Sequence, residues 1–166
     1  MLPWYNLVWF SGNTPRHSFI VWLAMLQKLS SQDRIWKFTQ GPLACVLCHK
    51  DLESHDHLFF TCTYSSSIWQ GIMSRFRMEG SPLDWTSFTV WAASKWKSKK
   101  PKDIMPRMCL GATIYAIWKE RNARIFRFEG KRSERVSSDI IINIQAQVSI
   151  KWARDPKLQG YLSVWS

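Results

Sequence analysis

The 166-residue sequence predicts an all-α protein, a compact multi-helix domain. In several long segments, apolar residues recur every three or four positions, which is the period of a helix with one buried face. Proline, glycine and capping residues mark the ends of these segments. No segment shows the sustained alternation of apolar and polar residues that a half-buried strand requires. A short loop rich in cysteine and histidine interrupts the N-terminal helices.

The N-terminal part predicts an aromatic arm followed by a buried helix. Met1 to Phe10 lack a helical period and indicate an extended arm, which ends in a turn at Ser11-Gly12-Asn13. Thr14 then caps a helix that has Pro15 in its first position, where proline lacks only an amide that would be unpaired anyway. The helix reaches about Leu29. Since its apolar residues lie nearly all round it, we expect it to be the central buried helix.

Three shorter helices are expected next. Ser31 opens one that runs to Phe38 and is stopped by Gln40-Gly41-Pro42. After the cysteine-rich loop, apolar residues from Ile68 to Phe76 recur at helical spacing, and a similar stripe runs from Trp85 to Trp96. We expect each stripe to face the core.

Lysine dominates the segment that follows. Residues 94–106 hold five lysines and two prolines and predict a linker. A long helix then spans about Arg107 to Arg127, with Gly130 marking its end. A last helix begins at Ser133 and ends at Asp155-Pro156, and its apolar residues repeat every four positions: Val136, Ile140, Ile144, Val148 and Trp152. Four basic side chains of the long helix are expected to project outward or sideways: Lys119, Arg121, Arg124 and Arg127.

The cysteine-rich loop carries four candidate metal ligands, Cys45, Cys48, His57 and Cys62, in the pattern C-x2-C-x8-H-x4-C. Two thiolates of a C-x2-C pair can reach one ion across a single turn, and the other ligands return from a second segment to complete the tetrahedron. The window contains three of the four cysteines in the chain, which favours a metal site over ordinary buried thiols. The ligand order is that of the knuckles that hold single-stranded nucleic acid, with a middle loop of eight residues instead of four. The sequence therefore predicts one structural Zn²⁺ ion in a CCHC knuckle inserted between N-terminal helices.

A disulfide is the alternative use for these cysteines. The sequence begins without a secretory signal peptide, so we expect an intracellular protein of the nucleus or cytoplasm, where thiols stay reduced. Zinc binding is therefore the preferred interpretation.

Three histidines, His49, His55 and His57, lie between the second and third cysteines of the window. His49 directly follows a ligand, so its ring is poorly placed to reach the same ion. Ser54 can cap a short helix that begins at His55, which would set His57 in the first turn and Cys62 just beyond the end. We choose His57 as the ligand and keep His55 as the alternative.

The formal charge of +11 is unevenly distributed. Residues 1–62 carry five basic and four acidic side chains, whereas residues 95–135 carry thirteen basic and four acidic ones, a net of +9. Such a field attracts polyanions, nucleic acid first and an acidic membrane surface second. The alternative is a solvated helix face with a flexible lysine linker. The candidate nucleic-acid-binding residues are Lys95, Lys97, Lys99, Lys100, Lys119, Arg121, Arg124 and Arg127.

These patterns divide the chain into three parts. Residues 1–80 are expected to form a zinc-binding helical region, residues 83–153 a basic helical region packed on it, and residues 154–166 a frayed tail. The first two parts should share one core, because 166 residues suit a single domain. No charge-free run approaches the length that crosses a bilayer, so no membrane partner is expected.

Residues before, within and after the metal window form a wider pattern. They are Trp9-Phe10, Pro15-Arg16-His17-Ser18-Phe19, Trp22-Leu23, Leu29, Asp33-Arg34, Cys45, Cys48, Glu53, His57-Leu58-Phe59-Phe60, Cys62 and Trp69. This pattern resembles the zinc-binding domain of plant non-LTR (LINE-type) retrotransposon reverse transcriptases. The run from Ile117 to Phe126 is similar to the segment that follows that domain in such polyproteins, so the resemblance spans about residues 4–128.

One departure from the family pattern is Ser30-Ser31-Gln32, where Pro-Thr-Arg is more usual, and it affects a helix cap and not the metal site. The resemblance implies a module downstream of the polymerase that holds the RNA template or the target DNA.

No enzymatic activity is expected. A polymerase needs paired aspartates to hold two magnesium ions, and no two acidic residues are adjacent in this sequence. A zinc ion with four protein ligands has no open position for a catalytic water, and Cys109 is best explained as a small core residue. Two functions remain. One is sequence-tolerant binding of RNA or DNA by a zinc-stabilised module, and the other is a protein-interaction scaffold that docks on a reverse transcriptase polypeptide or another partner.

Overall fold

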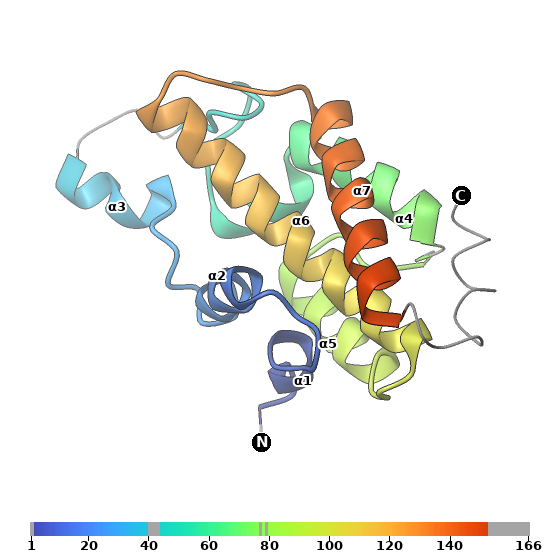
Figure 1. Cartoon of the computed structure of the whole chain (residues 1–166). Helices are drawn as coiled ribbons and strands as arrows, with labels where there is room; N and C mark the ends of the chain where they lie inside the picture. The colour runs from blue at the N-terminus through green and yellow to red at the C-terminus, as the bar shows by residue number, and fades with distance from the viewer. Residues whose placement is uncertain (1, 40–43, 77, 79, 153–166) are drawn as a thin grey trace.

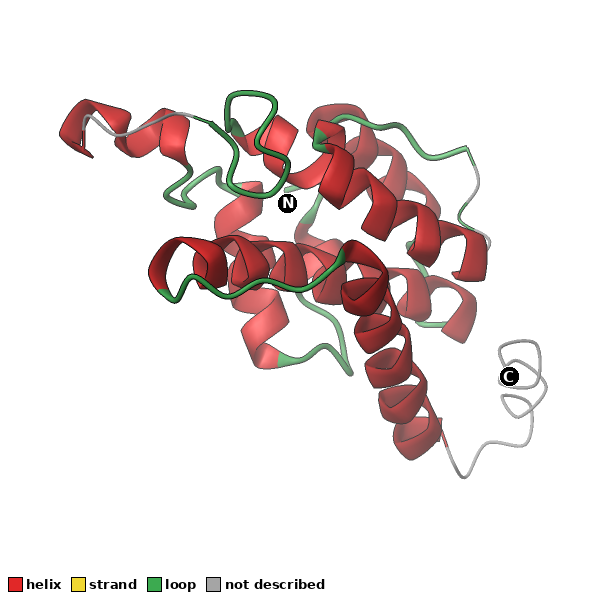
Figure 2. Cartoon of the chain, turned by 90° about the horizontal axis from the view of Figure 1, so that it is seen from above, coloured by secondary structure: helices red, strands yellow, loops and turns green. Residues whose placement is uncertain are grey.

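The computed structural model describes residues 2–39, 44–76, 78 and 80–152, and these residues form helices joined by loops (Figures 1 and 2). No strand occurs within these ranges, where a single isolated antiparallel bridge joins Ala44 to Leu52. The predicted all-α class is therefore confirmed. The elements in order are α1 (Tyr5–Val8), α2 (Pro15–Met25), α3 (Gln32–Thr39), the π-helical turn η1 (His57–Thr61), α4 (Thr63–Phe76), α5 (Trp85–Lys95), α6 (Pro101–Phe126) and α7 (Ser133–Trp152).

The central helix of the fold is α6. Figure 1 shows it crossing the molecule between α2 and α7, and it contacts α1, α2, η1, α4 and α7. Sixteen of its 26 residues are buried. By contrast, α2 buries only Ser18, Val21 and Ala24, and the Phe19 side chain on this helix is 52% exposed. The prediction that the helix from Thr14 to Leu29 is central is wrong, because part of its apolar surface faces outward.

Two segments that were predicted to be irregular are helical. Tyr5–Val8 form α1, in which Leu7 and Val8 are fully buried, so the predicted extended arm is wrong at these residues. Helix α6 begins at Pro101 and includes Pro106, although the sequence predicted a linker up to that residue. Pro101 occupies the first position of the helix, where proline favours a start, and Asp103 in the first turn complements the helix dipole.

The predicted stripes of α4 and α5 form the aromatic part of the core. Phe60 of η1 stacks on Trp69 of α4 with their ring planes 5° apart. The ring centroid of Phe88 in α5 lies 5.6 Å from that of Trp69. The indole Nε1–H of Trp69 donates a 2.7 Å hydrogen bond to the carbonyl of Phe59. This packing fixes η1 against α4 and α5.

Helix α7 covers α4 and α6 with the apolar stripe that its sequence predicted. The buried members of the stripe are Val136, Ile140, Ile144 and Val148. The predicted stops at Gln40-Gly41-Pro42 and Asp155-Pro156, and the tail over residues 154–166, lie outside the described residues. Within the described ranges, no helix combines the length and the apolar character needed to cross a membrane.

Candidate metal centre

The loop between α3 and η1 folds back on itself around the C-x2-C pair. The amide of Cys45 donates to the carbonyl of Asp51 at 2.8 Å, and the amide of His49 donates to the carbonyl of Cys45 at the same distance. His49 adopts a left-handed conformation with φ of 56° and is exposed. This turn places Cys45 and Cys48 on one side of the loop and directs His49 to solvent.

The third and fourth ligands come from η1 and its end. The Ser54 hydroxyl oxygen accepts a 3.1 Å hydrogen bond from the amide of His57, so the predicted capping role of Ser54 is confirmed. The amide of Cys62 donates to the carbonyl of His57, five residues earlier, at 2.8 Å. In this wider π-helical turn, a type that recurs at functional sites, His57 begins η1 and Cys62 follows its last residue, and their ligand atoms lie within 4.8 Å of each other.

The four predicted ligands meet in space. One ligand atom from each of Cys45, Cys48, His57 and Cys62 lies within 4.8 Å of all the others. The Cys45 and Cys62 sulfurs are 3.8 Å apart, and the Cys48 sulfur is 3.4 Å from His57 Nε2. With zinc–sulfur bonds of about 2.3 Å and zinc–nitrogen bonds of about 2.0–2.1 Å, a tetrahedral ion separates its ligand atoms by about 3.8 and 3.5 Å. The donor set and its spacing therefore fit one zinc ion.

Contacts around the ligands prepare them for a cation. His57 Nδ1 lies 3.3 Å from the Thr61 hydroxyl oxygen, so an N–H at this position can donate to Thr61 and leave Nε2 free for a metal. A hydrogen bond from the Cys45 thiol lowers the pKa of Cys62 to about 5, an effect that burial opposes. The same hydrogen bond, together with burial, raises the pKa of Cys45 above the ordinary range, so this pair shares one proton.

His55, the alternative ligand, lies outside this group. Its ring packs edge-on against Trp85 at 4.5 Å and Phe59 at 5.0 Å between centroids. Burial is the largest cause of the lowering of the His55 pKa to about 4. His55 is therefore a neutral core residue, and the choice of His57 as the ligand agrees with the geometry.

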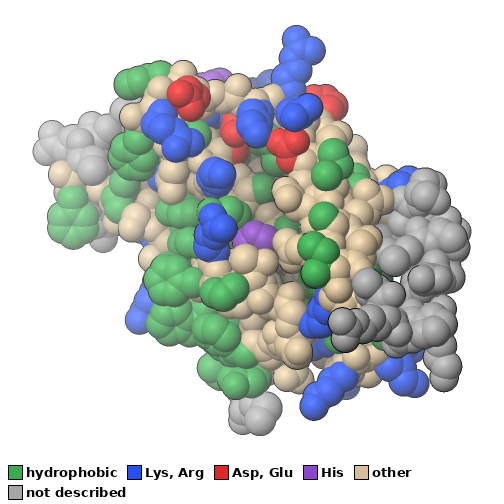
Figure 3. All heavy atoms as spheres, viewed as in Figure 1, with side chains coloured by type: hydrophobic (Ala, Val, Ile, Leu, Met, Phe, Trp, Pro, Cys, Tyr) green, Lys and Arg blue, Asp and Glu red, His purple; other side chains and the backbone are tan. Residues whose placement is uncertain are grey.

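The candidate nucleic-acid-binding residues lie near opposite ends of α6. Lys95 is exposed at the end of α5, and Lys97, Lys99 and Lys100 are exposed in the loop that leads to α6. Lys119 and Arg127 are exposed near the other end of α6. Because α6 has 26 residues, its two ends are about 39 Å apart. Figure 3 shows Lys and Arg side chains at the upper edge, near the centre and at the lower edge of one face, with acidic side chains visible only in its upper part. The positive region of the sequence is thus divided into two clusters.

Arg121 and Arg124, which were expected to project outward or sideways, are instead held in contacts within the fold. The Arg121 side chain is 3% exposed and forms two hydrogen bonds with Glu53, at 2.8 and 3.2 Å. The Arg124 side chain is 19% exposed and its Nε–H donates to Glu120 at 3.0 Å. Both residues lie on the face of α6 that the metal loop covers. Glu53 is one of three acidic residues in the cysteine- and histidine-rich window, and nothing in the sequence singles it out as the partner of Arg121.

Lys119 and Arg127 line a cleft of about 670 Å³ between the start of α2, α6 and α7. The same cleft is lined by Glu120, Glu129 and Asp139. Arg127 lies 3.6 Å from Glu129. This end of α6 therefore presents charges of both signs.

Comparison with known proteins agrees with the metal centre. Residues 1–69 match a family model described as zinc-binding in reverse transcriptase. The matched segment contains Cys45, Cys48, His57 and Cys62, so the resemblance of the metal window is confirmed. The plant and LINE-type details, and the similarity of the run from Ile117 to Phe126, are outside this match and stay predictions. No curated protein and no solved structure matches the chain.

Proposed function

We propose that this chain is a zinc-stabilised, non-catalytic module that binds single-stranded or structured RNA and DNA with little sequence preference. The observation that carries the proposal is the lysine cluster, defined as Lys95, Lys97, Lys99, Lys100 and Lys102. All five side chains are exposed, and none forms an ion pair with another of the described residues. Five unpaired positive charges within eight residues attract a phosphate backbone at any base sequence.

The backbone of the lysine cluster is fixed although its charges are free. Asp103 accepts a 2.7 Å hydrogen bond from the amide of Ser98, and the Arg107 guanidinium donates to the Ser98 carbonyl. The Ser98 hydroxyl in turn accepts from the amide of Lys100. A held loop lowers the entropic cost of presenting several cations to one ligand at once.

Charge, and not stacking, is expected to supply the affinity. Trp96 lies between Lys95 and Lys97 in the sequence, but its side chain is only 6% exposed. Its ring centroid is 5.4 Å from that of Trp91. Its face is therefore not offered to a base. Binding without stacking or base-edge contacts should be strongly dependent on salt.

A structural role for the zinc supports the non-catalytic part of the proposal. Three thiolates and one imidazole complete a tetrahedral shell, which leaves no open position for a water or substrate. The ion then stabilises the fold, while the lysine cluster at the far end of α6 meets the nucleic acid.

Docking on a reverse transcriptase polypeptide is the second candidate function. The observation in its favour is a set of exposed apolar side chains on and beside α1 and α2, namely Leu2, Tyr5, Trp9 and Phe19. The family description, which places such zinc-binding segments in reverse transcriptases, is consistent with this partner.

The test is fluorescence anisotropy with labelled single-stranded RNA and DNA, measured across a salt series on zinc-loaded protein. One variant changes Lys95, Lys97, Lys99 and Lys100 to Glu, and its matched control changes Lys119, Arg127, Arg132 and Arg135 to Glu. The two variants have the same net charge, so only the position of the reversal differs.

We expect the first variant to lose at least about 100-fold in affinity at low salt and the control to lose much less. If four phosphate contacts are removed, the slope of log affinity against log salt should become shallower by roughly 2.8. Equal losses in both variants would show that net charge alone attracts the ligand. Absence of binding by wild-type protein at low salt would reject the proposal in favour of the protein-docking function.

A further inference from the structure

Arg124 contacts the backbone between the first two metal ligands. Its Nη1 atom donates to the carbonyl oxygens of Leu47 at 3.1 Å and Val46 at 3.4 Å. These are the two residues between Cys45 and Cys48. A side chain from the last turn of α6, 76 residues after Cys48, thus holds the turn between the first two metal ligands.

The same two peptide units face the Cys45 sulfur. The backbone N–H groups of Leu47 and Cys48 lower the pKa of the Cys45 thiol, an effect that its hydrogen bond with Cys62 and its burial outweigh, and the carbonyls of these two peptide units belong to Val46 and Leu47. In a trans peptide unit the N–H and C=O groups point in opposite directions, so fixing the oxygens also aims the N–H groups. A cation on the carbonyls further polarises the peptide units and strengthens the donation to a thiolate.

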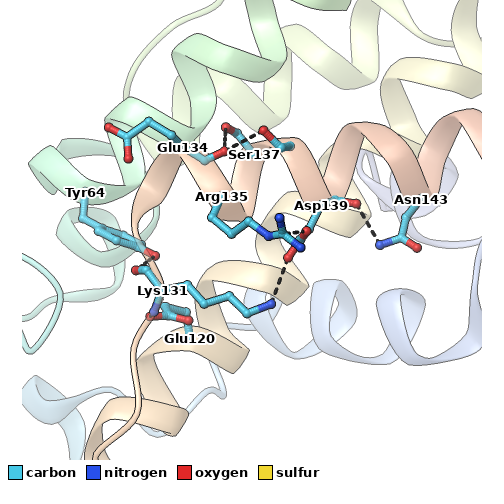
Figure 4. A network of polar contacts seen from close by, with 9 residues as sticks. Tyr64, Glu120, Lys131, Glu134, Arg135, Ser137, Asp139 and Asn143 are labelled. Carbon is cyan, nitrogen blue, oxygen red and sulfur yellow. Dashed lines mark hydrogen bonds and ion pairs between the residues drawn. The ribbon is translucent and has the colours of Figure 1, made fainter.

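Three further groups contact the Arg124 guanidinium: the Glu120 carboxylate, the Lys131 carbonyl and the Tyr64 ring. Besides the contact with Glu120, it donates to the carbonyl of Lys131 at 3.0 Å and lies 4.5 Å above the Tyr64 ring. Figure 4 shows how Glu120 and Tyr64 converge on Lys131: its amide donates to Glu120 at 2.7 Å and its carbonyl accepts from Tyr64 at 2.9 Å. Tyr64 is two residues from Cys62, so this network connects both halves of the ligand set.

Arg121, one helical turn earlier, holds the other end of the metal loop. Its ion pair with Glu53 is buried, with side chains 3% and 0% exposed. Glu53 also accepts a 2.7 Å hydrogen bond from the amide of Gln32 at the start of α3. The segment from Cys45 to Ser54 is therefore fastened to α6 at two points.

From these contacts we propose that Arg124 is a positioning residue of the zinc centre, which acts through the two peptide units between Cys45 and Cys48. The unit that binds zinc then extends beyond residues 1–69 and includes the C-terminal part of α6. The inference concerns the metal centre only and holds whether or not the protein binds nucleic acid.

The test uses the full chain and compares Arg124→Lys with Arg127→Lys. The two variants make the same substitution, one in the last turn of α6 and the other at its C-cap, but the Arg127 side chain is 58% exposed and is paired with Glu129. Zinc affinity and release rate are measured by competition with a chromophoric chelator. Co²⁺-loaded protein gives an absorption spectrum that reports the ligand geometry, which a merely structural contact would leave unchanged.

We expect Arg124→Lys to bind zinc about 10- to 100-fold more weakly and to release it faster, since loss of an outer contact of a metal ligand has effects of this size. Its Co²⁺ thiolate-to-metal bands should shift, and Arg127→Lys should match wild type within about twofold. Wild-type zinc affinity and an unshifted Co²⁺ spectrum in Arg124→Lys would overturn the proposal.

If Arg124→Lys does not fold, Glu120→Gln tests the same proposal. This variant keeps Arg124 and weakens two contacts that orient it: the direct one with Glu120, and the one with the Lys131 carbonyl, whose backbone Glu120 holds through the Lys131 amide. We expect a smaller loss of zinc affinity in the same direction, accompanied by a smaller shift of the Co²⁺ bands. In that case, an affinity and spectrum equal to wild type would overturn the proposal.

Discussion

At the scale of the residue, His57, which begins η1, and His55, two residues before it, lie in different environments. His57 directs Nε2 to the Cys48 sulfur, whereas His55 is packed between aromatic rings. His57→Ala should therefore lower zinc affinity by more than about 100-fold, because removal of a ligand exceeds the effect of removing an outer contact. His55→Ala should leave zinc affinity near wild type and lower thermal stability. Chelator competition on both variants is the measurement, and the reverse order would assign the ligand role to His55.

Glu53 is not a metal ligand, but we expect its replacement to destabilise the metal loop strongly. Glu53→Gln removes one partner of the buried pair with Arg121, which leaves an uncompensated buried charge and should destabilise the protein by about 3–5 kcal/mol. Glu129→Gln is the control, because the Glu129 side chain is 74% exposed and an exposed pair contributes about 0–1 kcal/mol. Chemical denaturation of zinc-loaded protein measures both. Equal effects would mean that the Arg121–Glu53 pair contributes no more than a surface contact.

His17 gives the protein a pH dependence of defined sign. Burial, and then the charge of Arg16, lower the pKa of His17 from the ordinary 6.5 to about 4. Between these values the unfolded chain binds the proton more readily than the folded one, so stability falls as the pH falls from about 6.5 towards 4.

A His17→Gln variant lacks this titration and retains the zinc ligands. It should lose less stability than wild type when denaturation is compared at pH 7 and pH 5. A loss as large as that of wild type would show that His17 is not held neutral in the fold.

The metal ligands were predictable from the sequence because four donor residues lie within eighteen positions and their spacing obeys local geometry. The positions of Arg121 and Arg124 were not predictable in the same way. An arginine at helical spacing from other basic residues has the pattern of a surface residue. The partner that buries Arg121 is an acidic residue 68 positions earlier, and the metal-loop carbonyls that Arg124 contacts are 77 and 78 positions earlier. Long-range pairing of this kind depends on the tertiary fold.

At the scale of the element, Arg107 joins three segments at the start of α6. Its buried guanidinium donates to the carbonyls of Asp103, Asn6 and Ser98, and so links α6 to α1 and to the lysine cluster. Arg107→Met would leave these three carbonyls without their donor. We expect a loss of about 2–4 kcal/mol in the free energy of unfolding, since unsatisfied buried polar groups are costly.

The control for Arg107→Met is Lys102→Met, at an exposed position of the same helix. This control should change the free energy of unfolding by less than about 0.5 kcal/mol. Urea denaturation of both variants measures the difference. Equal stability of Arg107→Met and wild type would contradict the linking role.

Some helices could be predicted from the sequence and others could not. The stripes of α4, α5 and α7 were predicted and are buried, because each has one apolar face with a regular period. Helix α1 was missed because four residues are too few to show a period. The start of α6 was missed because two prolines were interpreted as breaks, whereas Pro101 begins the helix and Pro106 is accommodated inside it.

At the scale of the whole molecule, α6 separates the metal loop from the lysine cluster. Its C-terminal part holds the metal loop through Arg121 and Arg124, and its N-terminal end carries the lysine cluster. The sequence predicted the net charge of the region but not this division, since charge counting along a chain does not show which cations are paired. Variants at one end can therefore be used as controls for the other.

The central claim is that one zinc ion, bound by Cys45, Cys48, His57 and Cys62, stabilises this helical fold. The most direct measurement is a chelator titration of the full chain in which zinc content and far-ultraviolet circular dichroism are recorded on the same samples. We expect one zinc per folded chain, a fall in helix content and in the thermal midpoint as zinc is removed, and recovery when zinc is added back. A chain that keeps its helix content and thermal midpoint after metal analysis shows the zinc to be gone would contradict the claim.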